Sequence, residues 1–212
     1  MDIIVKKILS RIYGNRRGWC FTPKNFLDLG IRPTIDSALS RLTEKGTIRR
    51  LARGLYDYPQ KHSQIGLLSP QPIAIAKAIA SRDASRFQPS GAYAAHILGL
   101  TDQVPAQIVF LTDGKDRRIV IGKQEIWLKN TTPRNMSTAG QISGSVFYAF
   151  RHLGKNEIND THVNHLRKAL SASDKKRILL DKAIAPIWMH IFIERIAKEN
   201  NGAQEDIFPK KD

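Results

Sequence analysis

Apolar and polar positions in the first 60 residues follow a helical period and then an extended one. Near the N-terminus, five apolar residues share one side of a helix that should pack across the next two helices: Ile3, Ile4, Ile8, Leu9 and Ile12. A short second helix should begin at Pro23, with Thr22 as its cap, and end at Gly30 after about two turns.

A third helix is predicted between Pro33 and Gly46, and its two faces differ in character. Apolar residues occupy one face: Ile35, Ala38, Leu39 and Leu42. Polar residues occupy the other face: Thr34, Ser37, Ser40, Arg41, Glu44 and Lys45. Because the apolar face should pack on a core, the polar face is the one that a partner can reach.

After Gly46 the pattern becomes extended. Residues 47–51 and 55–58 should form two strands, joined by a turn at Arg53 and Gly54. This hairpin carries three arginines: Arg49, Arg50 and Arg53. Three helices followed by a basic hairpin predict a winged helix-turn-helix, a module that binds duplex DNA, in residues 1–60.

The rest of the chain predicts a second, mixed domain over residues 73–200, preceded by a proline-rich linker at 61–72 and followed by a flexible tail at 201–212. The expected order is helix 73–80, strand 86–89, helix 92–98, then strands 107–112, 117–121 and 125–129 as an antiparallel meander. Four helices should follow near 142–153, 160–171, 174–182 and 186–199, with Asp160 and Ser173 as caps. The fold class is therefore α+β, with a small antiparallel sheet and a helical C-terminal part.

The last predicted helix carries a continuous apolar stripe. Its members are Ile187, Trp188, Ile191, Phe192 and Ile196. We expect this stripe to pack on the core, and the alternative is a docking face for a partner protein.

The charge of the chain narrows the choice of partners. The 212 residues carry a formal charge of +15, and residues 1–62 hold 13 Lys and Arg against five Asp and Glu. Such an excess of positive charge favours a polyanion or a membrane surface as the binding partner. No stretch approaches the roughly 20 apolar residues of a membrane span. The single cysteine, Cys20, excludes an internal disulfide and should be buried and inert, so a cytoplasmic location is expected.

The predicted winged helix supplies a set of candidate DNA contacts. Thr34, Ser37 and Arg41 should lie near base edges, and Ser40 and Lys45 nearer phosphate. Three hairpin arginines should reach phosphate or a groove, with Arg53 at the tip near the minor groove: Arg49, Arg50 and Arg53. Lys24 and Asn25 could fix the register through phosphate. Asp36 and Glu44 would repel phosphate, so they should point away from it or form pairs within the helix.

A search for catalytic residues finds mainly absences. The chain lacks a phosphate-binding glycine loop, a glycine-flanked nucleophilic serine and a zinc-protease histidine pair. His162 and His165 share a helix face but have no third ligand nearby. Asp113 and Glu125, with Lys123 or Lys129, could hold Mg²⁺ in a nuclease, although the Glu-x-Lys spacing typical of such sites is missing. We therefore expect a protein that is not an enzyme and needs no metal or cofactor.

Two segments, together with the prolines of the predicted linker between them, resemble the AbiEi-type antitoxins of abortive-infection toxin–antitoxin systems. They are residues 50–56 (RLARGLY) and residues 90–105 (SGAYAAHILGLTDQVP), and the likeness extends over about residues 5–135. The order along the chain, winged helix first and helix-Leu-Gly-Leu-Thr second, carries the resemblance. Compared with larger members of that family, the chain is compact and its wing is dense in arginine.

The resemblance implies an antitoxin that also represses its own operon. The winged helix would bind inverted repeats in its own promoter, and the C-terminal region would neutralise a toxin that looks like a nucleotidyltransferase. In type IV systems the antitoxin opposes the toxin's effect without a stable complex, so direct binding of the toxin is not implied.

Two alternatives remain open at the level of sequence. One is a winged-helix transcription factor whose second domain senses a ligand or dimerises, and the other is a metal-dependent nuclease that uses the winged helix for targeting.

Overall fold

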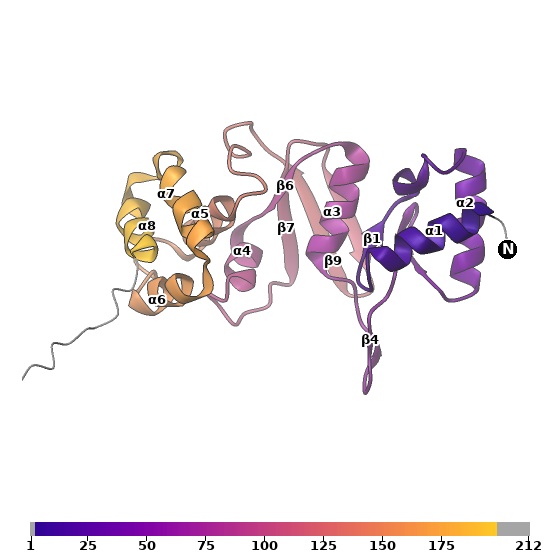
Figure 1. Cartoon of the computed structure of the whole chain (residues 1–212). Coiled ribbons are helices and arrows are strands. Elements are labelled where there is room, and N and C mark those ends of the chain that lie inside the picture. Colours follow the sequence, from indigo (N-terminus) through magenta and orange to yellow (C-terminus); the bar gives the residue numbers. More distant parts are fainter. Residues whose placement is uncertain (1–2, 199–212) are drawn as a thin grey trace, which may run out of the picture.

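The N-terminal helices and hairpin form one end of an elongated molecule, and four C-terminal helices form the other end (Figure 1). A sheet of four strands, covered on one face by a helix, lies between them. This computed structural model describes residues 3–198. The α+β class predicted from the sequence is confirmed.

The N-terminal unit contains the predicted helices and wing, and one further strand. Its elements are α1 (Ile3–Gly14), β1 (Cys20–Phe21), the 3₁₀ turn η1 (Pro23–Phe26), α2 (Arg32–Glu44), β2 (Arg49–Ala52) and β3 (Leu55–Asp57). The sheet order is β1-β3-β2, and both pairings are antiparallel. The short strand β1 was not predicted, and it makes the hairpin a three-stranded wing sheet.

Two local predictions in this unit are wrong. Ile3 is exposed rather than buried, and Val5 takes its place on the buried side of α1. The second helix is a 3₁₀ turn over Pro23–Phe26 instead of two α-helical turns. The Leu29 amide donates to the carbonyl of Phe26 instead of that of Asn25, and the Asn25 carbonyl accepts from the Arg11 guanidinium.

An aromatic cluster joins the helices to the wing sheet. Phe21 stacks on Tyr56 and meets Phe26 edge-on, with ring centroids 6.0 and 5.5 Å apart. The apolar face predicted for α2 is confirmed, because all four of its members are buried in this core: Ile35, Ala38, Leu39 and Leu42.

The segment predicted as a linker forms a small hairpin instead. Strands β4 (Lys61–His62) and β5 (Gly66–Leu67) pair antiparallel, and the hairpin projects from the body of the molecule (Figure 1). Its residues are exposed. Pro70 and Pro72, which suggested an irregular connection, are buried where the chain returns to the body.

The central unit places its strands in a different order from the predicted meander. Its elements are α3 (Pro72–Asp83), β6 (Phe87–Pro89), α4 (Gly91–Ile97), β7 (Gln107–Thr112), β8 (Arg117–Ile121) and β9 (Gln124–Asn130). The order is β6-β7-β9-β8, and β7 pairs with β9 in parallel. The apolar Ile126 and Leu128 place β9 in the interior of the sheet, whereas Arg117 and Arg118 suit β8 to the exposed edge.

The central unit shares its core with the wing sheet. Helix α3 covers the sheet face that contains Phe110 and Ile126, and Cys20 and Leu55 of the wing sheet belong to the same buried cluster. The predicted boundary at residue 60 therefore separates two sequence segments but not two independent cores.

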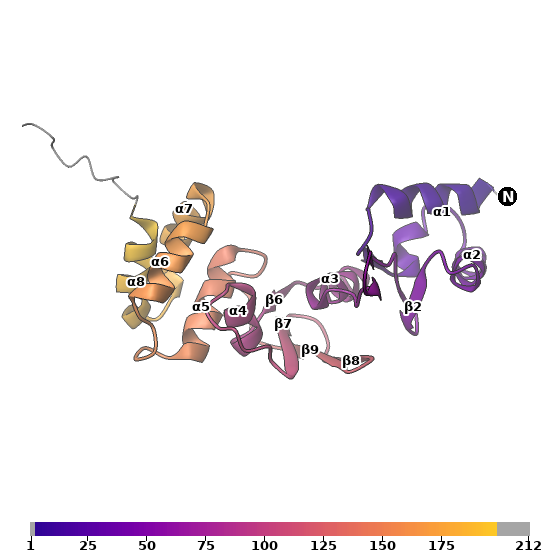
Figure 2. The same cartoon turned by 90° about the horizontal axis from the view of Figure 1, so that it is seen from below.

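The C-terminal helices pack on α4 (Figure 2). They are α5 (Ile142–Leu153), α6 (Asp160–Ala169), α7 (Ala172–Leu180) and α8 (His190–Ala197), with 3₁₀ turns η2 (Lys182–Ile184) and η3 (Ile187–Met189) before α8. The caps of α6 and α7 are Asn159 and Ser171 rather than Asp160 and Ser173. No helix within residues 3–198 combines the length and the apolar character needed to cross a membrane.

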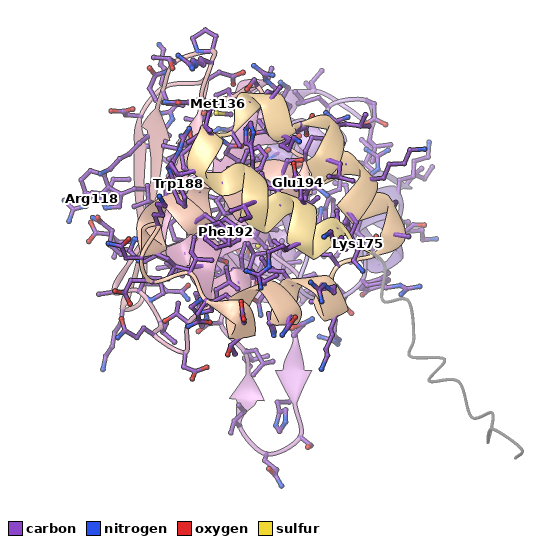
Figure 3. All side chains as sticks on the ribbon, turned by 90° about the vertical axis from the view of Figure 1, so that its left-hand side faces the viewer. Arg118, Met136, Lys175, Trp188, Phe192 and Glu194 are labelled. Atoms are coloured by element: carbon purple, nitrogen blue, oxygen red, sulfur yellow. The ribbon has the colours of Figure 1, made fainter. Side chains whose placement is uncertain are left out.

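The apolar stripe on the last helix packs only in part. Ile196 is buried, and Trp188 and Phe192 lie at the edge of the core (Figure 3). Ile187 and Ile191 are 85% and 61% exposed, so the prediction of core packing is wrong for these two. The predicted tail at 201–212 lies outside the described residues.

Gly144 provides a test of the packing between α5 and the loop before it. A Cβ at this buried position would lie 2.8 Å from the carbonyl oxygen of Thr138. We expect Gly144→Ala to lower the free energy of unfolding by about 1–3 kcal/mol, as overpacking does. Gly14→Ala is the matched control because a Cβ there meets open space. In urea unfolding, the stability of Gly14→Ala should be unchanged or higher than that of the wild type by up to about 1 kcal/mol. Equal losses of stability in both variants would contradict the packing described.

Candidate nucleic-acid interface

A cleft of about 650 Å³ lies between α2, the β2–β3 hairpin and the C-terminal end of α3. Its basic lining residues are Lys24, Arg32, Arg50, Arg53 and Arg82, and its acidic ones are Asp36 and Glu44. Arg50 and Arg53 form no ion pair with any residue of the described part of the chain. The cleft therefore has an excess of positive charge, and part of that charge is free to meet an anion.

Local backbone geometry presents the wing arginines to this cleft. Gly54 turns the hairpin with a φ of +70°, a conformation that glycine adopts without strain. The pairing of β2 with β3 shifts register between Arg50 and Ala52, so the strand bends before the turn. On the opposite wall, the buried face of α2 fixes which of its polar residues point toward the wing.

Arg49, predicted as a DNA contact, has a structural role instead. Its guanidinium donates to both carboxylate oxygens of Asp57, at 3.0 and 2.6 Å, and to the carbonyl of Leu68 at 2.8 Å. Asp57 is only 1% exposed. The hydrogen bonds to Asp57 raise the pKa of Arg49 above its usual range. Because these partners occupy the guanidinium, we leave Arg49 out of the contact set.

The two residues predicted at the start of the preceding helix are also engaged. The Asn25 side-chain oxygen accepts from the backbone amide of Thr22 at 2.9 Å, within a capping box. The ammonium of Lys24 donates to the carbonyl of Arg82 at 3.0 Å and lines the cleft. Lys24 thus stays in the candidate interface, whereas Asn25 stabilises the local turn.

The two acidic residues of α2 line the cleft rather than pointing away from it. Asp36 pairs with Arg32 at 2.8 Å, and Glu44 accepts from the hydroxyl of Ser40 at 3.1 Å. The expectation of pairing within the helix is therefore confirmed. These partners reduce the repulsion that either carboxylate would exert on phosphate.

Four other candidates lie elsewhere on α2 or, in the case of Lys45, at its C-cap. Ser40 lines the cleft, but the following do not: Thr34, Ser37, Arg41 and Lys45. With about 100° of rotation per residue, they lie on the outer side and far flank of the helix. Thr34 is half-buried, and Arg41 donates to the hydroxyl of Ser37 at 3.2 Å. The cleft thus brings together four of the ten predicted residues: Lys24, Ser40, Arg50 and Arg53.

Two basic residues of the cleft were missed in the sequence. Arg32 precedes the predicted start of the helix, although its spacing from Asp36 is typical of an i,i+4 ion pair and could have identified it. Arg82 belongs to α3, and only the tertiary fold brings it to Lys24. The carboxylate of the next residue, Asp83, accepts hydrogen bonds from the guanidinium groups of Arg82 and Arg117. The hydrogen bond from Arg82 holds the pKa of Asp83 below its usual range.

The residues proposed for a nuclease site are not brought together. Because β7 and β9 are parallel and Gln107 faces Glu125, Asp113 lies beyond the opposite end of the sheet from Glu125, about 20 Å away. Asp113 instead accepts from the backbone and the guanidinium of Arg86, and these bonds lower its pKa. Residues 3–198 contain no cluster of three or more potential metal ligands.

The remaining titratable candidates have structural partners. The His162 ring accepts from the backbone amide of Asn159, and the His165 ring bonds the carbonyl of Leu98 at 2.9 Å. Cys20 is buried as predicted, and burial together with the Asp57 carboxylate raises the pKa of its thiol to about 12. A thiol with that pKa is a poor nucleophile at neutral pH.

The Arg49–Asp57 pair should make a measurable contribution to stability. Asp57→Asn keeps the shape of the side chain but removes the charged acceptor, so urea unfolding should show a loss of about 1.5–3 kcal/mol. Asp36→Asn is the matched control, because its pair with Arg32 is exposed and should contribute about 0.5 kcal/mol or less. A loss no larger in Asp57→Asn than in the control would contradict the structural role assigned to Arg49.

Comparison with known proteins gives a family but no function. No curated protein matches the chain. The model of DUF6088, described as a family of unknown function, matches residues 7–178. That range runs from α1 to α7, so it includes the cleft, the central sheet and most of the C-terminal helices. Because the match spans most of the 212 residues, the chain belongs to the DUF6088 family.

Proposed function

We propose that this chain binds duplex DNA through α2 and the β2–β3 hairpin. The observation that carries the proposal is the cleft between these elements, in which five basic side chains meet two compensated carboxylates. A helix-turn-helix places its last helix in the major groove, and a wing beside it can follow the backbone or the minor groove. Basic residues on both walls suit the phosphates that border a groove.

Within this arrangement the residues divide by role. Arg50 and Arg53 on the wing and Lys24 in η1 are the phosphate or minor-groove contacts, whereas the guanidinium of Arg82, which also lines the cleft, is paired with Asp83. Ser40, Asp36 and Glu44 line the cleft on the α2 side, where hydroxyl and carboxylate groups can accept from the exocyclic amine of cytosine or adenine. Recognition of a specific sequence would therefore come from α2, and most of the affinity from the wing and Lys24.

The biological role that we propose is that of a cytoplasmic antitoxin which represses its own operon. This part rests on the resemblance of residues 50–56 and 90–105 to AbiEi-type antitoxins. The partners would be inverted repeats in its own promoter and a nucleotidyltransferase-like toxin, whose effect is opposed with or without direct binding.

Single substitutions should test the cleft as the DNA-binding site. Arg50→Ala and Arg53→Ala should each weaken binding to every duplex alike and reduce the salt dependence of log K by about one unit. Fluorescence anisotropy with a labelled promoter fragment and a scrambled duplex, from low to moderate salt, measures both quantities. Lys176→Ala on α7 is the control and should change neither, because it lies at the opposite end of the molecule (Figure 1).

Arg41→Ala tests whether DNA binds in the cleft or at the residues on the outer side of α2 that the sequence alone predicted. If Arg41 contacts a base, its removal should cost about 1–3 kcal/mol on the promoter fragment and much less on the scrambled duplex. The structure leaves Arg41 outside the cleft, so we expect a smaller effect than that of Arg53→Ala. If Arg41→Ala weakens binding and Arg53→Ala does not, the cleft is not the DNA-binding site.

Growth assays should separate repression from neutralisation of a toxin. The adjacent reading frame is induced with and without the full-length chain or its Arg50→Glu/Arg53→Glu variant. Deleting residues 1–62 is less informative, because Cys20 and Leu55 belong to the central core. Rescue by both full-length forms, with promoter repression by the wild type only, is the expected result. If the adjacent gene is not toxic, the antitoxin role fails and a plain winged-helix repressor remains.

A further inference from the structure

A second cleft, of about 620 Å³, lies on the other side of the wing strand β2. It is bounded by β2, by the loop that leads into β7 and by the turn between β8 and β9. Strands β2 and β8 are neighbours in space although they belong to different parts of the chain (Figure 2). The cleft is thus formed where the N-terminal unit meets the central unit, a common place for a ligand site.

The lining of this cleft combines an apolar wall with cations at the rim. The apolar part comprises Leu51, Val104, Pro105, Ile108 and Ile121. Arg50 approaches from the wing strand and Lys123 from the β8–β9 turn. Both are exposed and form no ion pair within residues 3–198. Arg49 also lines the cleft, but Asp57 and Leu68 already occupy its guanidinium.

Gln124 adds a buried hydrogen-bond acceptor, without a partner in residues 3–198, to the residues that line the cleft. It lines this cleft and also an adjoining hollow of about 350 Å³ that Val104, Pro105 and Ile108 share. Its side-chain oxygen is buried and has no hydrogen-bond partner among the described residues. A buried acceptor without a partner is costly, so a ligand with a hydrogen-bond donor would gain by reaching it after a side-chain rotation.

We propose that this cleft binds a small amphipathic organic anion, with its apolar body against Val104 and Ile121 and its anionic group between Arg50 and Lys123. The volume lies within the range of small-molecule sites, and an apolar lining with a few converging polar groups is typical of them. Charge complementarity decides the sign of the ligand, since the only unpaired charges assigned to the rim are positive.

Arg50 couples the binding of this ligand to the binding of DNA. It lines both the cleft beside α2 and the cleft behind the wing, and one guanidinium cannot serve a phosphate and a bound anion fully at the same time. The ligand therefore lowers the affinity for DNA, and DNA lowers the affinity for the ligand by the same factor. This regulatory part rests on the DNA-binding function proposed above, whereas the ligand site itself does not.

The probe for the site is 8-anilinonaphthalene-1-sulfonate, whose aromatic body and sulfonate match the proposed class and whose fluorescence rises in an apolar environment. Lys123→Ala should weaken its binding about three- to fivefold, as expected for loss of a partly exposed ion pair. Ala106→Trp, at an exposed position that lines the cleft, should fill it and abolish binding. Lys155→Ala, an exposed lysine after α5, is the matched control and should bind as the wild type does. Circular dichroism and thermal unfolding verify that each variant is folded.

A titration of labelled promoter DNA in the presence of saturating probe tests the coupling. The dissociation constant for DNA should rise about fivefold or more, in the usual range of coupling between sites. Lys123→Ala should bind DNA normally without the probe, because Lys123 does not line the cleft beside α2. The Lys123→Ala variant should need a higher concentration of probe than the wild type for the same rise in the dissociation constant for DNA.

The possible outcomes separate the two proposals. Equal fluorescence from wild type, Lys123→Ala and Ala106→Trp would place the probe elsewhere, for example on the exposed Ile187 and Ile191, and would overturn the ligand site. Variant-sensitive probe binding with an unchanged affinity for DNA would overturn the competition for Arg50. Variant-sensitive probe binding by a chain that does not bind DNA would support the ligand site and refute the DNA-binding function.

Discussion

The arrangement of the N-terminal half depends on one partly buried ion pair, Arg49 with Asp57. Asp57 lies on β3, Arg49 on β2, and the same guanidinium also reaches the carbonyl of Leu68, just before α3 begins. A carboxylate that is 1% exposed is tolerated only with such compensation, because an unpaired buried charge is strongly destabilising. The pair therefore fixes the wing sheet and the chain that enters α3 in one geometry. Both clefts lie against this fixed framework, one on each side of β2.

Much of the winged helix could be predicted from the sequence, because its signals are local. The apolar face of α2, Thr22 before Pro23, and Gly54 at the hairpin turn each act within a few residues. The two-residue strand β1 gives no periodic pattern, so it is recognisable only from its partner β3. The β4–β5 hairpin was also missed, because strands of two residues cannot be distinguished from a polar linker.

The wrong strand order in the central unit and the cleft residue Arg82 that was missed have a common cause, which is that sequence patterns do not report tertiary neighbours. The alternation of polar and apolar residues predicted β7, β8 and β9 correctly but not the parallel pairing that places Asp113 and Glu125 at opposite ends. Nor can the charge pattern of the hairpin show that Arg49 is committed to Asp57 while Arg50 and Arg53 form no ion pair with any residue from 3 to 198. Arg82 enters the candidate interface for the same reason, since its neighbour Lys24 is distant in sequence.

The shared core of the wing sheet and α3 has a mechanical consequence. Since Cys20 and Leu55 are packed with α3, the winged helix is not tethered by a flexible linker but is the rigid end of a rod-like chain (Figure 1). When the N-terminal end of such a chain is bound, the orientation of its C-terminal helices is fixed as well. If two copies occupy an inverted repeat, the two-fold symmetry of the DNA would be imposed on their distal helices, which would project from the duplex along two defined directions. The exposed Ile187 and Ile191 at the far end would then be displayed at a reproducible distance from the operator.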